Sequence, residues 1–146
     1  MANLRELHEF DFNLWVEEIK TKIQRRDIDD MDWDNLLDEI EDMGASQKRA
    51  LDSYLQRLIE YVLKLKHWEA ECDRCRQGWM VEVSNFRSRI NRILKKNPSL
   101  KNYVANAYDD IYQDAITAMR FQFHLPDDCL ISLEAIMTED FLKTDK

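Results

Sequence analysis

Apolar residues recur every three or four positions along most of the chain, and no stretch alternates apolar and polar residues with a period of two. Only two glycines and two prolines interrupt the 146 residues, so turn signals are few. This pattern predicts an all-α fold. We expect a single helical domain over residues 1–146, built as a bundle of four main helices with a short C-terminal helix.

The first main helix is expected over residues 11–25, with the Asp11 side chain as its N-cap. One face of this helix is apolar and consists of Phe12, Trp15, Val16, Ile19 and Ile23. An acidic connector over residues 27–31 follows.

The second helix is predicted to run without a break from Trp33 to Trp68, capped by Asp32 and about 50 Å long. Its apolar stripe keeps the same phase before and after Gly44, whereas a break would normally reset the phase. The stripe consists of Trp33, Leu36, Leu37, Ile40, Met43, Leu51, Tyr54, Leu55, Leu58, Tyr61, Val62 and Leu65. Because Gly44 lies inside the stripe, we expect another helix to cross closely there. Gln47 lies near the stripe centre, so we expect a buried amide with a hydrogen-bond partner.

The third and fourth helices are expected over residues 79–96 and from Pro98 onward, with Asn97 as the cap before an N1 proline. The third helix buries Trp79, Val83, Phe86, Ile90, Ile93 and Leu94. The fourth buries Leu100, Val104, Ala107, Tyr108, Ile111, Ala115, Ala118 and Met119. Ser132 is expected to cap a last helix that reaches Glu139 and packs Leu133, Ile136, Met137 and Phe141 onto the bundle.

Several of these residues resemble a family catalogued as domain of unknown function twenty-nine. The resemblance is carried by Asp11-Phe12 with Trp15, the run WDNLLDEIEDMGAS over residues 33–46, Trp79, NPSL over residues 97–100, Pro126, Cys129 and SLEAIMTEDFL from Ser132. It implies an all-helical single domain found in bacteria, with no established activity, substrate or cofactor.

The chain departs from this family pattern at four positions. Relatives often carry an acid where Gln47 stands and a histidine where Tyr61 stands, so a polar site formed there in relatives would be altered in this chain. Cys72 and Cys75 lie where the pattern has no cysteine, whereas Cys129 matches it.

The net charge of −8 and the isoelectric point near 4.9 make nucleic acid an unlikely partner, because phosphate binding needs a basic surface. Lys64, Lys66 and Arg120 interrupt the longest apolar runs, so no membrane association is expected. The first residues lack the features of a secretory signal, and we expect a cytoplasmic protein with reduced thiols.

Charge is strongly segregated along the chain. Residues 27–42 contain nine carboxylates and no lysine or arginine, whereas residues 83–108 contain six basic residues and no acid. The two segments are interpreted as neighbours in the fold or across a homodimer. Alternatively, the basic helix binds an anionic partner. The candidate partner-binding residues are Arg87, Arg89, Arg92, Lys95 and Lys96.

The segment HWEAECDRCRQGW places Cys72 and Cys75 at metal-ligand spacing, five residues after His67. A closed zinc site needs four ligands and a redox dithiol is expected beside a βαβ pattern, so both hypotheses have weak support. The favoured interpretation is an exposed connector between two helices. Glu39 is the fourth weak metal candidate, and it is interpreted as a boundary carboxylate paired with a basic residue of the third helix. No cofactor is predicted, because two glycines cannot build a phosphate-binding loop.

The favoured functional hypothesis is a non-catalytic interaction module that binds itself or another protein. The alternative is a metal-dependent enzyme of unknown substrate that uses Glu39 or the group of His67, Cys72 and Cys75. A third hypothesis is the antitoxin-like half of a bacterial gene pair.

Overall fold

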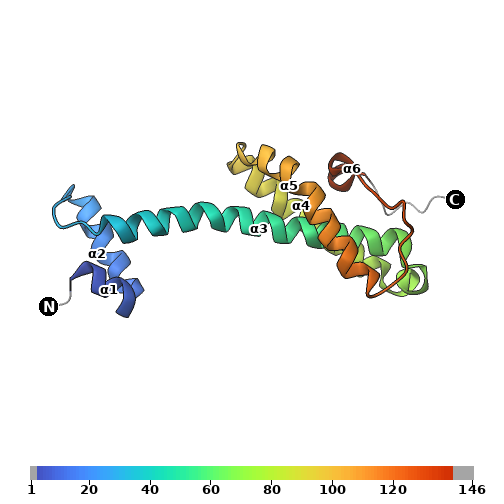
Figure 1. Cartoon of the computed structure of the whole chain (residues 1–146), viewed down its shortest axis with the longest axis horizontal. Coiled ribbons are helices and arrows are strands. Elements are labelled where there is room, and N and C mark those ends of the chain that lie inside the picture. The colour runs from blue at the N-terminus through green and yellow to red at the C-terminus, as the bar shows by residue number, and fades with distance from the viewer. Residues whose placement is uncertain (1–2, 140–146) are drawn as a thin grey trace. The chain divides into compact units, whose positions relative to one another are not determined.

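The computed structural model describes residues 3–139, and the regular structure within this range is entirely helical (Figure 1). Its helices are α1 (Leu4–Phe10), α2 (Phe12–Gln24), α3 (Trp33–His67), α4 (Glu69–Lys96), α5 (Leu100–Arg120) and α6 (Leu133–Thr138). The predicted all-α class is confirmed. The chain divides into two compact units, which we call unit 1 (residues 1–46) and unit 2 (residues 47–146), so the expected single domain stays a prediction. No helix in the described range has both the length and the apolar character needed to cross a bilayer.

Unit 1 contains α1, α2 and the first turns of α3. Asn3 caps α1 by accepting a hydrogen bond from the Glu6 amide at 2.8 Å, and Asp11 ends α1 and caps α2 by accepting from the Leu14 amide at 3.1 Å. The predicted helix over residues 11–25 is therefore confirmed with its cap. The sequence pattern missed α1, a seven-residue helix with no buried residue. The core of unit 1 is small: Trp15, Ile19 and Met31 are buried, with Leu4, Leu7 and Leu36 packed against them.

Helix α3 is continuous from Trp33 to His67, which confirms the argument from phase across Gly44. Two expectations attached to it are wrong. A Cβ atom on Gly44 would meet no neighbouring element within 4 Å, so no helix among residues 3–139 crosses closely there, and the Gln47 side chain is exposed. The physical reason is that periodicity identifies an apolar face without identifying what covers it. The stripe is buried or half-buried from Leu51 onward, but Trp33, Leu37, Ile40 and Met43 are exposed.

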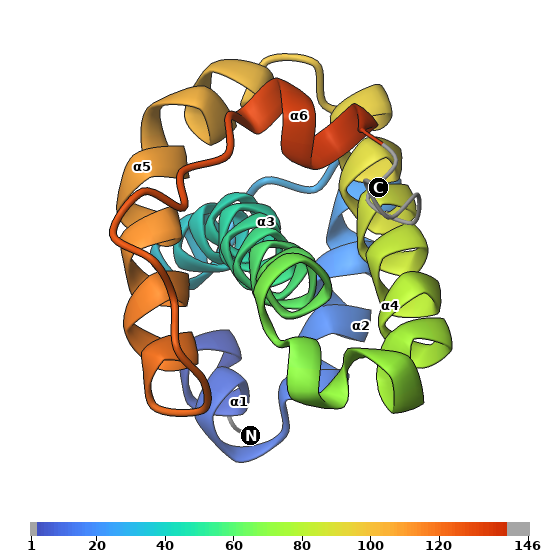
Figure 2. The same ribbon diagram turned by 90° about the vertical axis from the view of Figure 1, so that its right-hand side faces the viewer.

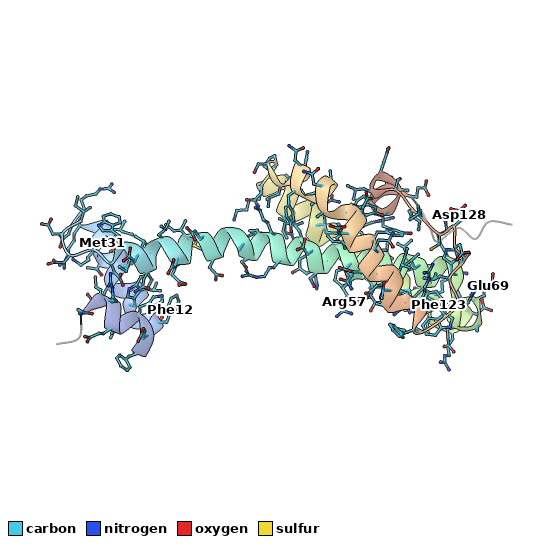
Figure 3. All side chains as sticks on the ribbon, viewed as in Figure 1. Phe12, Met31, Arg57, Glu69, Phe123 and Asp128 are labelled. Carbon is cyan, nitrogen blue, oxygen red and sulfur yellow. The ribbon has the colours of Figure 1, made fainter. Side chains whose placement is uncertain are left out.

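Unit 2 is built around the second part of α3, which lies between α4 and α5 with α6 on a third side (Figure 2). Its largest fully buried side chains come from four helices: Leu51, Leu55, Leu58, Ile59, Val62, Leu63, Ile90, Tyr112 and Ile136. The helical conformation is interrupted at Trp68, between α3 and α4. The Trp68 ring stacks on the rings of Trp79 and Phe123, with centroids 5.8 and 5.0 Å away. Phe123 accordingly lies beside the start of α4 at Glu69 (Figure 3).

Two predicted boundaries differ from the structure. Helix α4 begins at Glu69 rather than at Trp79, because the polar segment after Trp68 contains no proline and continues the helix. Helix α5 begins at Leu100 rather than at Pro98. Asn97 caps the end of α4 instead of the start of α5, since both its backbone amide and its side-chain amide donate to the Ile93 carbonyl, at 2.8 and 2.9 Å.

The segment after α5 closes the core of unit 2. The buried hydroxyl of Tyr108 donates to the Ile131 carbonyl at 2.6 Å, and that of Tyr112 donates to the Cys129 carbonyl. Ser132 caps α6 by accepting from the Ala135 amide at 3.1 Å, as predicted. Phe141, which was expected to pack with α6, lies outside the described residues.

Candidate functional site

An apolar groove lies between α2 and the first turns of α3 in unit 1, with a volume of about 420 Å³. We call it the α2–α3 groove. Its apolar walls are Phe12, Trp15, Val16, Ile19 and Ile23 from α2 and Leu36, Ile40 and Met43 from α3. Lys20, Gln24, Glu39 and Asp42 complete its lining. The α2 wall is the apolar face that the sequence predicted for this helix.

Several apolar walls of the groove remain open to solvent. Ile40 is 55% exposed and Met43 is 68% exposed, while Phe12 and Ile23 are each about half exposed. Figure 3 shows the Phe12 side chain on α2 and Met31 in the loop before α3. A contiguous exposed apolar surface of this kind is typical of a binding site, whereas scattered single exposed apolar residues are ordinary.

The floor of the groove is fixed by a buried polar contact. The Trp15 indole N–H donates to Asp32 Oδ2 at 3.1 Å, and Asn35 Nδ2 donates to the same oxygen at 2.7 Å. Asp32 also accepts from the Asn35 amide at 3.5 Å and so caps α3, as predicted. Burial raises the pKa of the Asp32 carboxyl, but the hydrogen bonds from Asn35 and Trp15 together outweigh burial, and the resulting pKa is lowered. A groove wall and the start of α3 are thereby held together.

Glu39 lies at the edge of this groove and its partner is His8 of α1, with 3.1 Å between His8 Nε2 and Glu39 Oε2. The His8 ring also contacts Trp15 and Phe12 edge-on, with centroids 4.8 and 5.5 Å away. The pairing expected from the sequence, with a basic residue of the helix at residues 79–96, would join the two units and stays a prediction. His8 lies 31 residues away in sequence, and helical spacing carries no signal for such a pair.

The unit that contains the groove is strongly acidic. Residues 1–46 contain 14 acidic and 5 basic residues, a formal net charge of −9, whereas residues 47–146 contain 15 acidic and 16 basic residues, a net charge of +1. Within unit 1, Arg5 pairs with Asp34 at 2.9 Å and Lys22 with Asp27 at 3.5 Å. The acidic and basic segments belong to different units, so their predicted proximity stays a prediction.

The basic residues proposed for partner binding differ in their contacts on α4. Arg87 donates from Nε to the Ile136 carbonyl at 2.9 Å and from Nη2 to the Glu139 carbonyl at 2.7 Å, and so ties α6 to α4. The Arg89 guanidinium lies 5.5 Å from the ring centroids of both Tyr54 and Phe86. The other three, Arg92, Lys95 and Lys96, are exposed at the end of α4. Their role in binding stays a prediction.

The expected exposed connector around the CxxC motif is wrong, because Cys72 and Cys75 lie within the first turns of α4. Cys72 is buried with its Sγ 3.7 Å from the Leu65 carbonyl oxygen, and Cys75 is half-buried with its Sγ 3.9 Å from Glu71 Oε2. His67 ends α3, and burial lowers its pKa, as does the neighbouring Lys66. Among residues 3–139, no three His, Cys, Asp or Glu side chains are grouped so that they could hold a metal ion.

Sequence reasoning missed a polar cavity of about 450 Å³ in unit 2. It is lined by Arg49, Asp52, Ser53, Gln56, Arg57, Glu60, Ile111 and Asp114. Glu60 is buried there, accepts a hydrogen bond from Gln56 Nε2 at 3.0 Å and lies 3.7 Å from Arg57 Nη1. Its position beside Ile59 on α3 could have marked it as buried, but a carboxylate is normally placed on the solvent face.

Gln47 and Tyr61, two of the positions that depart from the family pattern, do not share a site. Tyr61 stacks on Phe86 with centroids 6.1 Å apart, and Lys64 Nζ lies 4.7 Å from the Tyr61 ring centroid. Gln47 is exposed 14 residues earlier on the same helix, about 21 Å away along its axis.

In a comparison with protein families, the family model described as "Domain of unknown function DUF29" matches residues 7–142. No curated protein and no solved structure matches the chain.

Proposed function

Since the chain belongs to the DUF29 family, whose description names no activity, we propose its function from the α2–α3 groove. The protein is a non-catalytic interaction module, and its groove binds an amphipathic helix of another protein. The observation that carries this proposal is the open apolar lining of the groove, with Ile40 55% exposed and Met43 68% exposed.

The spacing of the groove walls supports a helical ligand. Leu36, Ile40 and Met43 follow one another at i, i+4 and i+7 on α3, and Phe12, Val16, Ile19 and Ile23 repeat the same spacing on α2. Helix-in-groove recognition places apolar anchors of matching spacing against such walls. Burial of each half-exposed apolar side chain contributes on the order of 1 kcal/mol, so several of them together support a specific complex.

The polar groups next to the groove also support binding over catalysis. Asp32 is held by Trp15 and Asn35, and Glu39 is held by His8. Each of these carboxylates already has a structural partner, which fixes the shape of the groove and leaves its apolar walls as the open feature.

Native mass spectrometry of the untagged protein, purified gently from its own cells, tests this proposal. The test variant is Ile40→Asp in the groove, and the matched control is Val81→Asp on α4, because both side chains are β-branched, half exposed and within a helix. We expect a hetero-complex of fixed stoichiometry for the wild-type chain and the control, and its loss in Ile40→Asp. A monomer in all three, or a complex that survives Ile40→Asp, contradicts the proposal. One metal ion per chain in place of a partner would favour the metal-dependent enzyme instead.

A further inference from the structure

We infer that the helix bound by the α2–α3 groove is basic: an amphipathic helix of another protein whose polar side carries lysine and arginine. This inference rests on the proposed function and adds the chemistry of the partner. Its basis is the combination, in one compact unit, of an open apolar groove and a formal charge of −9.

Two acidic side chains, Glu39 and Asp42, belong to the lining of the groove itself. Asp38 and Glu41 are exposed in the same turns of α3, on the side turned away from the groove, and add to the negative field of unit 1. The basic lining residue, Lys20, has Glu17 as a partner 4.0 Å away on the same helix. A helix lying on Ile40 and Met43 therefore passes the carboxylates of Glu39 and Asp42. Lysine and arginine suit these flanks, because their methylene stems pack on apolar walls while their charged groups reach the carboxylates.

The same charge disfavours three other occupants. Two copies joined through this face would each bring a unit of charge −9, so their like charges would oppose association. Anionic lipid and nucleic acid surfaces are repelled for the same reason. A second copy could offer the basic end of α4, with Arg92, Lys95 and Lys96, but the exposed large apolar side chain of α4 is Val81, far from that end. The basic end of α4 would therefore pair with the carboxylates of unit 1 but would leave the apolar walls of the groove uncovered.

Three synthetic peptides of about four helical turns distinguish the contribution of charge to binding from the contribution of the apolar groove. All three have leucine at the same i, i+3, i+4 and i+7 positions, and their other positions are lysine, glutamine or glutamate. Their dissociation constants are measured by fluorescence anisotropy against the full-length wild type, Ile40→Asp, Val81→Asp and the double variant Glu39→Gln with Asp42→Asn.

We expect the leucine–lysine peptide to bind the wild type at least about fivefold more tightly than the leucine–glutamine peptide, with the leucine–glutamate peptide weakest. Raising the salt concentration from about 50 mM to about 500 mM should remove most of that advantage. Ile40→Asp should abolish binding of the lysine and glutamine peptides, and Val81→Asp should leave it unchanged. The double variant should weaken binding of the lysine peptide alone.

The possible failures are distinguishable. If the glutamine peptide binds as tightly as the lysine peptide and both depend on Ile40, the basic partner is wrong and the groove is still a binding site. If no peptide binds in an Ile40-dependent way, the groove itself is wrong as a docking site for helices. If sedimentation velocity shows a dimer that Ile40→Asp dissociates, the occupant is a second copy and the inference is overturned.

Discussion

The indole N–H of Trp15 donates a hydrogen bond to the carboxylate of Asp32, with 3.1 Å between the two heavy atoms. Trp15 is a buried side chain of α2, and Asp32 is the cap of α3. One contact thus joins the wall of the groove to the start of the helix that forms its other wall, and the first three predictions below concern residues of this kind, which link one element to another.

Trp15→Phe keeps an aromatic ring in the core of unit 1 but removes the donor to Asp32. Because a hydrogen bond to a charged group contributes about 1.5–3 kcal/mol, we expect the free energy of unfolding to fall by about 2 kcal/mol. Urea unfolding followed by circular dichroism measures this change. Trp33→Phe is the matched control: Trp33 is 57% exposed, and a change within about 0.5 kcal/mol is expected. Equal effects of the two substitutions would show that the contact with Asp32 contributes nothing.

Acid should weaken unit 1 through Asp32. The folded pKa of this carboxyl is lowered from its ordinary value of 3.8, so its contribution to stability is complete above that value and is lost as the pH falls through the lower, folded pKa. Unfolding free energies measured between about pH 5 and about pH 2 should therefore fall more steeply for the wild type than for Asp32→Asn. Parallel curves for the two proteins would contradict this assignment.

Alkali should weaken unit 2 through Tyr108 and Tyr112. Burial raises the pKa of both phenols far above the ordinary value of 10.0, so the folded state keeps protons that the unfolded state releases. Stability is then complete below about pH 10 and is lost as the pH rises above that value. The double variant Tyr108→Phe with Tyr112→Phe should lose less stability than the wild type between about pH 9 and about pH 11, although it is less stable at pH 7. Normal ionisation of all tyrosines in the folded protein, seen by ultraviolet absorbance, would show that the two hydroxyls are not buried.

Gly44→Ala should stabilise the chain. A Cβ atom at this position of α3 meets nothing within 4 Å, and alanine is favoured over glycine within a helix by up to about 1 kcal/mol. Thermal unfolding measures the gain, and Gly78→Ala on α4 is the control, because its Cβ also meets nothing within 4 Å. A loss of stability in Gly44→Ala alone would indicate that another helix packs closely against Gly44, as the sequence pattern suggested.

Reversing the charge of Arg89 and Arg92 separates the two candidate binding surfaces. If the groove is the docking site, the double variant Arg89→Glu with Arg92→Glu should bind the leucine–lysine peptide at least as tightly as the wild type. Circular dichroism should show unchanged helix content, since both side chains are exposed. Binding of the leucine–glutamate peptide by the wild type that is lost in the double variant would instead assign the interaction to α4, which is the surface that the sequence pattern proposed for an anionic partner.

The sequence predicted the helices well where a local signal marks them. Asp11 and Ser132 cap α2 and α6 as expected. Helix α3 continues through Gly44, as the unchanged phase of its apolar stripe indicated. The start of α4 was missed, since the break at Trp68 is a single residue without glycine or proline, and the predicted start at residue 79 lies inside the helix. A single non-helical residue of this kind is not marked by any particular residue type in the sequence.

The candidate site was predicted only in part. Periodicity identified Phe12, Ile40 and Met43 as apolar-face residues, but it assigned them to a buried core, because spacing cannot show whether a neighbour covers a face. The pairing of His8 with Glu39 and the burial of Glu60 depend on contacts that a local pattern does not encode.

The charge of unit 1 also bears on how the protein is handled in the absence of a partner. An apolar groove that stays open favours aggregation, and the charge of −9 opposes it by keeping the copies apart. That protection weakens as the pH approaches the isoelectric point near 4.9, where the carboxylates begin to take up protons and the net charge vanishes. The purified chain should therefore precipitate first in mildly acidic buffer, while it is still folded, and a bound basic helix should prevent this by covering the groove.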